Sequence, residues 1–262
     1  MKLHFFGTQN GEMPDPERRH TSFAFEHKGK LYFFDAGENC AYTAYLMDLN
    51  LLDIRAIFIS HTHMDHIGGL PNLIWYMTRQ SLSTTKKKYR GVEAVDLFIP
   101  RLEVWEHMLG IIKYTEFGLR RNFELNAHRV EDGVIFDDGD FKVTALHNTH
   151  LPRKDMNDKS RSFGFLIEAD GLRVVYSGDT GGVDEFIPLF PCDYAIVETG
   201  HLNGLSVANR LLDIGKLPAK KLIYSHHGPS MKGIHANDVY ESIENLLPGK
   251  NIIAKDGMTI EL

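Results

Sequence analysis

The stretch "IRAIFISHTHMDH", residues 54–66, joins an apolar, β-branched run to three histidines and an aspartate. The run has the length and composition of a buried strand. The segment that follows, "GGLPNLIWYMTRQS", repeats its large apolar residues at helical spacing. We therefore expect the histidines on a strand-to-helix turn. In an extended segment residues two apart point the same way, so His61 and His63 can reach one metal ion.

Imidazole and carboxylate groups in this pattern suit a metal ion, with zinc first and iron or manganese as alternatives. The other reading is a polar loop that is rich in histidine by chance, and partners elsewhere in the chain would decide between the two. Three later segments supply such partners: "VTALHNTH" ends in His150, "VVYSGDTGG" contains Asp179, and "LIYSHHGP" contains His226. Each follows a predicted strand, and the carboxyl ends of strands are where sites assemble in α/β sheets.

The 262 residues, 43% of them hydrophobic, suffice for a well-buried core. Predicted strands alternate with predicted helices, such as "VDEFIPLF", and the chain closes with a predicted strand pair in "NIIAKDGMTIEL". There is no repeat of short period and no Pro/Gly-rich linker. The pattern predicts a single α/β domain over residues 1–262, with two sheets and helices outside them.

The opening segment "MKLHFFGTQNGEMPDPERRH" lacks the features of a signal peptide, and no later apolar run approaches about 20 residues. We therefore expect a cytoplasmic protein without a membrane partner. Cys40 and Cys192 lie far apart with no CxxC pair, so neither a disulfide framework nor a cysteine zinc site is indicated.

The chain carries 35 acidic and 29 basic residues, a formal net charge of -6, which disfavours a general grip on nucleic-acid backbone. The basic run "KKKYR", Lys86 to Arg90, either contacts phosphate or is a solvated connection.

The order of these motifs, "HTHMDH", a histidine after a strand, "SGDT" and "SHHGP", resembles the metallo-β-lactamase-fold hydrolases over nearly the whole chain. The resemblance is nearest to the phosphodiesterase and tRNA 3′-processing endonuclease branch. It implies a four-layer αβ/βα sandwich of two mixed β-sheets with outer helices. It also implies two divalent metal ions: one on His61, His63 and His150, the other on Asp65, His66 and His226, with Asp179 as a bridge and Asp35 orienting a ligand or the turn.

Two metal ions about 3.5 to 4 Å apart can share a hydroxide and polarise the group under attack. The resemblance implies such a bridging hydroxide as the nucleophile, with Asp65 among the catalytic residues. The segment "VETGH" is similar in position to the acidic motif of the tRNA-processing members, and we expect His201, oriented by Glu198, to be the general acid. The alternative for this pair is a salt-bridged loop.

The leading hypothesis is a phosphodiesterase that acts on a small nucleotide-like or cyclic phosphodiester. A thioester or lactone hydrolase, an RNA 3′-processing endonuclease and a non-catalytic ligand-binding protein are the alternatives. True β-lactamases of this fold have a cysteine at the position of Asp179, which argues against antibiotic hydrolysis. The resemblance also implies a homodimer.

Four other residues have two readings each. Arg18 and Arg19 either face substrate or lie in a solvated loop, and His227 either touches substrate or is a loop histidine. His147 is expected to be a core histidine, or one that supports a ligand, rather than a ligand itself.

Overall fold

The computed structural model describes residues 1–12, 15–83, 91–115, 118, 120–151, 161–233 and 236–262. The chain forms two compact units: unit 1 comprises residues 1–8, 14–130 and 255–262, and unit 2 comprises residues 9–13 and 131–254. The single domain over residues 1–262 stays a prediction, and each unit is described by itself. The basic run from Lys86 to Arg90 lies outside the described residues.

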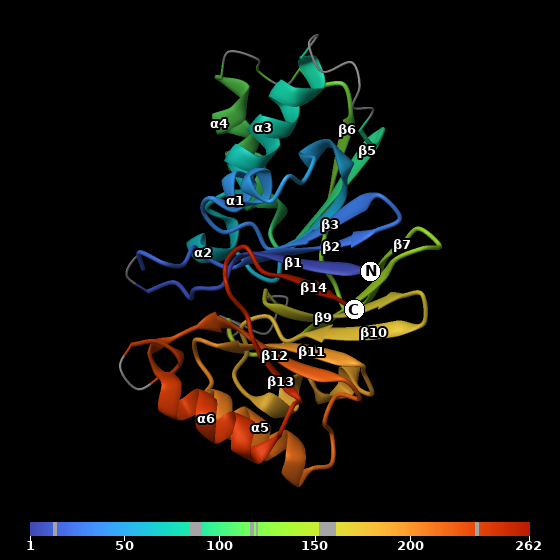
Figure 1. Ribbon diagram of the computed structural model, residues 1–262. Coiled ribbons are helices and arrows are strands. Elements are labelled where there is room, and N and C mark those ends of the chain that lie inside the picture. The colour runs from blue at the N-terminus through green and yellow to red at the C-terminus, as the bar shows by residue number, and fades with distance from the viewer. Residues whose placement is uncertain (13–14, 84–90, 116–117, 119, 152–160, 234–235) are drawn as a thin grey trace. The chain divides into compact units, whose positions relative to one another are not determined.

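Unit 1 is built on a mixed sheet with the strand order β14-β1-β2-β3-β4-β5-β6 (Figure 1). Its strands are β1 (Lys2–Gly7), β2 (Ser22–His27), β3 (Lys30–Phe34), β4 (Ile54–Phe58), β5 (Ala94–Ile99), β6 (Glu124–Arg129) and β14 (Thr259–Glu261). The pairs from β3 to β6 are parallel, whereas β14, β1, β2 and β3 pair antiparallel.

The helices of unit 1 are α1 (Cys40–Leu46), α2 (Met64–Ile67), α3 (Leu70–Leu82) and α4 (Leu102–Lys113), with a 3₁₀ turn, η1, at Leu51–Asp53. As the helical spacing predicts, Leu73, Ile74 and Met77 of α3 are buried in one apolar cluster with residues of β4 and β5. Burial of each such side chain contributes about 1.5–3 kcal/mol. This packing fixes the turn between β4 and α3, where the histidine motif lies.

Unit 2 contains a second mixed sheet, with the strand order β13-β12-β11-β10-β9-β8-β7. Its strands are β7 (Gly133–Asp137), β8 (Lys142–His147), β9 (Phe163–Ala169), β10 (Leu172–Tyr176), β11 (Tyr194–Thr199), β12 (Lys221–His227) and β13 (Asn251–Ile253). The strands from β10 to β13 are parallel, so their carboxyl ends lie at one edge. Because β9 is antiparallel to both neighbours, β8 also ends at that edge.

Helices α5 (Gly204–Asp213) and α6 (Ala236–Leu246) lie side by side in unit 2 (Figure 1). Val207 and Leu211 of α5 and Ile243 of α6 are buried in one cluster with residues of β11 and β12. Three 3₁₀ turns complete this unit: η2 (Val183–Glu185), η3 (Ile187–Leu189) and η4 (Pro229–Met231).

Two predicted elements are wrong in detail. The segment "VDEFIPLF" forms η2 and η3 rather than one α-helix, and Pro188, which has no N–H to donate, lies within η3. The strands at the C-terminus are not a pair, because β13 joins β12 whereas β14 joins β1. Strands β6 and β7 were not predicted.

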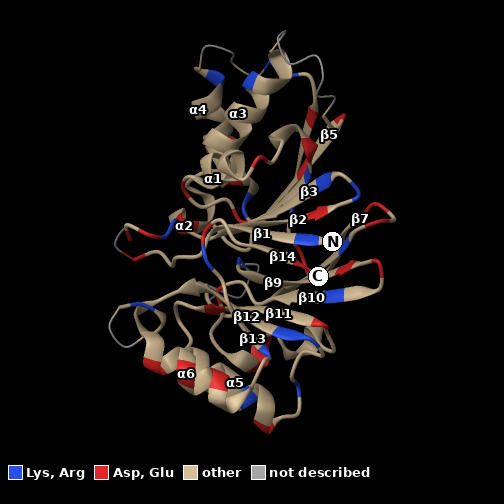
Figure 2. Cartoon of the chain, in the orientation of Figure 1, with Lys and Arg blue, Asp and Glu red and all other residues tan. Residues whose placement is uncertain are grey.

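Cys40 and Cys192 are both free and buried, in agreement with the sequence. Among the described residues, no helix has the length and apolar character that a membrane span requires. Basic and acidic residues are interspersed over both units (Figure 2).

Candidate metal centre

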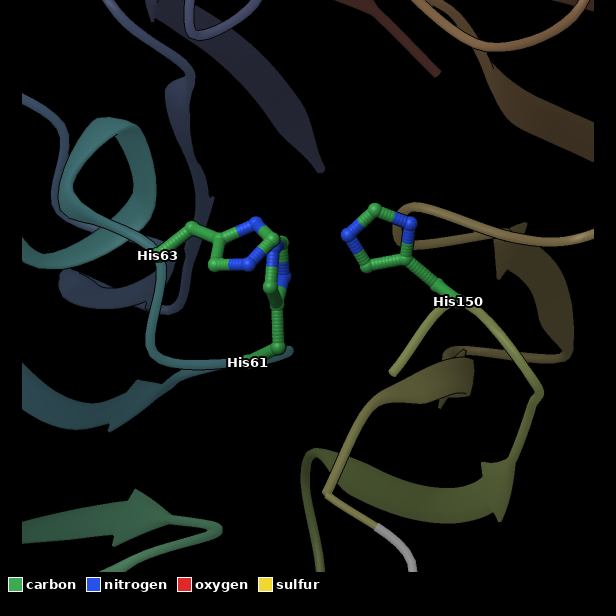
Figure 3. Close-up of side chains that lie close together, drawn as sticks. All are labelled: His61, His63 and His150. Atoms are coloured by element: carbon green, nitrogen blue, oxygen red, sulfur yellow. The ribbon is translucent and has the colours of Figure 1, made fainter. Parts of the chain in front are cut away.

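Unit 1 carries the first set of candidate ligands, His61, His63, Asp65 and His66, which we call the N-terminal ligand group. It occupies the turn from β4 into α2. The rings of His61 and His63 lie 4.6 Å apart between centroids (Figure 3), and the rings of His61 and His66 lie 4.0 Å apart. His61, Asp65 and His66 are buried. The turn therefore gathers three imidazoles and a carboxylate in a small volume, as the sequence predicts.

Asp35 holds this turn in place. It follows β3 with a φ of 55°, a conformation that aspartate tolerates better than most residues, and its side chain is fully buried. One carboxylate oxygen accepts hydrogen bonds from the Ser60 amide at 2.7 Å and from the Ser60 hydroxyl at 3.0 Å. The other lies 2.9 Å from Nδ1 of His66. A carboxylate at Nδ1 fixes the imidazole tautomer that leaves Nε2 for a metal, which agrees with the role predicted for Asp35.

Unit 2 carries the second set, His150, Asp179 and His226, which we call the C-terminal ligand group. His150 is in the loop after β8 (Figure 3), Asp179 in the loop after β10, and His226 near the end of β12. Asn148 links the first two loops, since its amide donates to the Asp179 carbonyl at 2.8 Å and its side-chain oxygen accepts from the His150 amide at 3.3 Å.

The two carboxylate oxygens of Asp179 face different imidazoles. Oδ1 lies 3.4 Å from Nε2 of His226, and Oδ2 lies 3.8 Å from Nε2 of His150. Asp179 is nearly fully buried. Two ligands of one tetrahedral zinc ion, each about 2.0–2.2 Å from it, are separated by about 3.4 Å. The donor types and these separations therefore fit metal ions on either side of the Asp179 carboxylate.

A β-bulge presents His226 to Asp179. In the register of β11 and β12, Glu198 faces Ser225 but Thr199 faces His227, so His226 is the extra residue, with a φ of 51°. A bulge of this kind re-aims a side chain. Gly200 lies so close to the ring that a Cβ at this position would stand 2.5 Å from Nδ1 of His226. The bulge and the glycine together set the position of this ligand.

Glu198 and His201 form the pair that the sequence predicts. Nδ1 of His201 lies 3.3 Å from Oε1 of Glu198, and the His201 amide donates to Oε2 at 2.7 Å. Nδ1 of His201 is also 3.6 Å from the Asp179 carboxylate. Glu198 is buried, whereas 46% of the His201 side chain is exposed. Glu198 thus anchors a histidine that is open to solvent beside the ligand group.

The charges of this pair depend on each other. Burial opposes ionisation of Glu198, but its interactions with His201 and His226 outweigh burial and hold the pKa of the carboxyl below its usual value. The hydrogen bond with Glu198 in turn raises the pKa of His201 above its usual value. A protonated His201 beside an ionised Glu198 is the state that this arrangement favours.

Two further histidines, His147 and His227, have positions that decide between their predicted roles. His147 is not a core histidine: 42% of its side chain is exposed, and Nδ1 lies 2.6 Å from the Asp132 carboxylate, because β8 ends there at the surface. His227 is fully buried, with Nδ1 3.1 Å from the Thr199 hydroxyl and Nε2 3.0 Å from the Ala254 carbonyl. It therefore supports the end of β12.

Arg18 and Arg19 belong to a hydrogen-bond network within unit 1 that also includes Thr8 and Asp256. Arg18 donates to the Thr8 hydroxyl at 2.8 Å, and that hydroxyl donates to Asp256 at 2.8 Å. The Arg19 amide donates to the same carboxylate. Burial raises the pKa of Asp256 above its usual value, although Thr8 and Arg19 act against this. These contacts give both arginines a structural role within unit 1.

Sequence reasoning missed Asn148 and Glu185. Neither belongs to a recognised motif, and each binds a residue distant in the chain, Asp179 for Asn148 and Thr149 for Glu185. The only local signal is the polar Asn148 two residues before a predicted ligand.

Comparison with known proteins supports the family and the fold. The family model described as "Anti-Pycsar protein Apyc1" matches residues 1–196. The ribonuclease Z of Methanothermobacter thermautotrophicus is 32% identical over 151 residues, which cover 57% of this chain and 45% of that protein. The ribonuclease Z of Methanococcus maripaludis is 32% identical over 190 residues, 66% of this chain and 57% of that protein. The chain thus spans about half the length of the curated relatives it matches.

Among solved structures, the short form of human tRNase Z matches with a TM-score of 0.71 and 21% identity, over 100% of this chain and 99% of that one. The metallo-β-lactamase-fold protein YhfI from Bacillus subtilis matches with a TM-score of 0.72 and 18% identity, over 99% of each chain. These comparisons confirm the predicted metallo-β-lactamase fold.

Proposed function

The chain belongs to the family of the anti-Pycsar protein Apyc1, and from this premise we propose that it is a phosphodiesterase that depends on two divalent metal ions. As the resemblance implies, His61, His63 and His150 would hold one ion, Asp65, His66 and His226 would hold the other, and Asp179 would contribute to both. The observation that carries the proposal is the Asp179 carboxylate, whose two oxygens face different imidazoles at 3.4 and 3.8 Å.

Zinc fits this donor set, because imidazole nitrogens outnumber carboxylate oxygens. Two such ions supply an activated water as nucleophile and neutralise charge on the phosphoryl oxygens. The protein's own part is to hold the ligands in place. Asp35 fixes the tautomer of His66, and the bulge fixes the ring of His226.

We assign the proton for the departing oxygen to His201. Glu198 binds both the amide and the ring of this residue, which restrains the ring beside Asp179 while 46% of the side chain stays open to solvent. A histidine held by a carboxylate retains its proton to higher pH and can donate it to an alkoxide leaving group. Glu198 is therefore a positioning residue, and His201 is the group that meets substrate.

A small cyclic or nucleotide-like phosphodiester is the substrate class that we favour. The net charge of -6, with acidic and basic residues interspersed along the described part of the chain, disfavours a broad electrostatic grip on a polymer. A small substrate needs only the charges inside the site.

RNA is the second candidate. It is favoured by the curated relatives named ribonuclease Z, at 32% identity over part of their length. These relatives give more weight to a nucleic-acid substrate than the net charge alone suggested.

The test combines metal analysis with a substrate panel. The panel holds a chromogenic phosphodiester, cyclic mononucleotides, a precursor tRNA, a thioester and a lactone. About two metal ions per chain and turnover of the phosphodiesters, both lost in Asp179→Ala, would support the proposal. Cleavage of precursor tRNA without cyclic nucleotide turnover would select the RNA reading. Turnover of only the thioester or lactone would refute a phosphodiesterase, and metal-free protein without turnover would point to ligand binding alone.

A further inference from the structure

We propose that Glu185 is a positioning residue that holds the loops of His150 and Asp179 at the separation that metal binding requires. The inference rests on the proposed function for its metal ions. Among the described residues, the hydrogen bonds of the Glu185 carboxylate lie within unit 2, and none of them is to a candidate ligand.

One carboxylate receives donors from two loops. From the loop of His150, the Thr149 hydroxyl donates to Oε1, and the Thr149 amide donates to Oε2 at 3.2 Å. From the loop of Asp179, the Thr180 hydroxyl donates to Oε2 at 2.6 Å, and the Gly181 amide donates to the same oxygen at 3.0 Å. Glu185 therefore binds the residue before one ligand and the two residues after the other.

The loops meet closely at this carboxylate. A Cβ on Gly181 would lie 2.5 Å from the Thr149 hydroxyl oxygen and 3.2 Å from Oε1 of Glu185. Only glycine allows this approach without displacement of the Thr149 side chain. Asn148 links the same loops through the Asp179 carbonyl. Two independent tethers therefore restrain the distance between His150 and Asp179.

The loops need such tethers because neither ligand lies in regular structure. β8 ends at His147 and β10 ends at Tyr176, three residues before His150 and Asp179 respectively. A metal site requires its ligands within about 0.5 Å of the productive geometry. The sheet alone does not give that precision to loop residues.

Glu185 is itself held firmly. It ends η2, and the next residue, Phe186, is buried in the cluster under α5. Burial opposes ionisation of Glu185, but the bonds from Thr149 and Thr180 outweigh it and keep the pKa of the carboxyl below its usual value. The negative charge strengthens each of the donors' bonds.

The adjacent residue provides a matched control. Asp184 lies in the same 3₁₀ turn and is exposed, and its carboxylate forms two bonds of 2.9 Å with Arg210. Asp184→Asn removes the same charge one residue away and leaves both ligand loops untouched.

The experiment measures zinc affinity by competition with a chromogenic chelator, together with thermal unfolding of the metal-free protein. In Glu185→Gln we expect zinc binding to weaken about 10- to 100-fold, as is typical when a group that supports a ligand is changed. Metal-free Glu185→Gln should unfold at a somewhat lower temperature than wild type because it loses the charged acceptor, but it should remain folded at the assay temperature. Asp184→Asn should bind zinc as wild type does. Thr149→Val removes one donor and should weaken binding in the same direction by a smaller factor.

Unchanged zinc affinity in Glu185→Gln would overturn the inference, as would equal weakening in Asp184→Asn. If Glu185→Gln fails to fold, Thr149→Val decides, and wild-type affinity in that variant would overturn the inference. A wild-type chain that binds no zinc would refute the proposed function, and this inference with it. Zinc bound equally by wild type and Glu185→Gln would refute the role of Glu185 alone.

Discussion

Replacement of Asp35 by Asn tests the N-terminal ligand group most directly. In the native side chain, one oxygen accepts from the Ser60 amide at 2.7 Å, and the other lies 2.9 Å from Nδ1 of His66. An amide keeps one acceptor oxygen and presents an NH₂ donor in place of the other. The buried Ser60 amide needs the oxygen, so the donor faces His66. Nδ1 then becomes an acceptor, and the ring proton moves to Nε2, the atom that should bind the metal.

The cost follows from the bond that is lost. A hydrogen bond to a charged group contributes about 1.5–3 kcal/mol, and about 1.4 kcal/mol corresponds to a factor of ten in affinity. Asp35→Asn should therefore bind the ion at His66 about 10- to 150-fold more weakly than wild type. Chelator competition with zinc measures this directly, and the ion on the opposite side of Asp179 should be less affected.

A matched control lies in the same unit. Asp96 also pairs with a histidine, at 3.1 Å from Nε2 of His128, and with Arg55, but it lies away from the ligands. Burial alone would raise the pKa of Asp96, but the bonds from Arg55 and His128 outweigh it and hold the pKa below its usual value. Asp96→Asn should leave zinc binding unchanged. Wild-type zinc affinity in Asp35→Asn, or an equal loss in Asp96→Asn, would refute the tautomer argument.

Four further outcomes are expected. Because the pKa of His201 is raised, turnover of an ester with a poor leaving group should fall only at a pH above about 6.5, the ordinary pKa of histidine. In a pH–rate profile, His201→Ala should lose this alkaline limb. Gly200→Ala places a methyl group 2.5 Å from the ring of His226, so it should lower stability by about 1–3 kcal/mol and reduce zinc content, as denaturant melts and elemental analysis would show. Because the pKa of Asp96 is lowered in the folded state, its carboxylate stabilises the fold above the unfolded-state pKa of about 3.9, and this stabilisation disappears as the pH falls through the folded-state pKa. The difference in unfolding free energy between wild type and Asp96→Asn should therefore close over that pH range. Burial raises the pKa of Cys40 to about 12, so a thiol reagent at pH 8 should label it only after unfolding.

The strands that could be predicted are those whose burial leaves a clear pattern. β4 is apolar and largely buried, and it appears in the sequence as a short β-branched run. β6, "ELNAHR", alternates exposed and half-buried residues without one large buried side chain, so its composition resembles a loop. β7 is mostly exposed as well. Both strands lie at a sheet edge, where the pairing partner rather than the residue's own hydrophobicity decides the conformation.

The candidate ligands could be proposed from the sequence because each, His150 and Asp179 included, stands in a short motif with a clear chemical pattern. Their supports could not. Glu185 lies in a segment that reads as an amphipathic helix, and its donors come from positions 149, 180 and 181. For His147 the sequence leaves a core position or the support of a ligand open, but the residue is the last of its strand and meets Asp132 at the surface. Such contacts depend on tertiary structure that no local window contains.

The supports also explain why the ligand motifs alone would not suffice to build this site. In unit 1 one buried carboxylate, Asp35, binds the turn and a ligand ring at once. In unit 2 the candidate ligands are held in position by three features: Asn148, Glu185 and the bulge that carries His226. Each of these groups restrains loop residues that the sheet leaves free, and a ligand displaced by about 1 Å makes a weak site. Transfer of the ligands to another scaffold should therefore fail unless these supports are transferred with them, because the geometry resides in the supports as much as in the ligands.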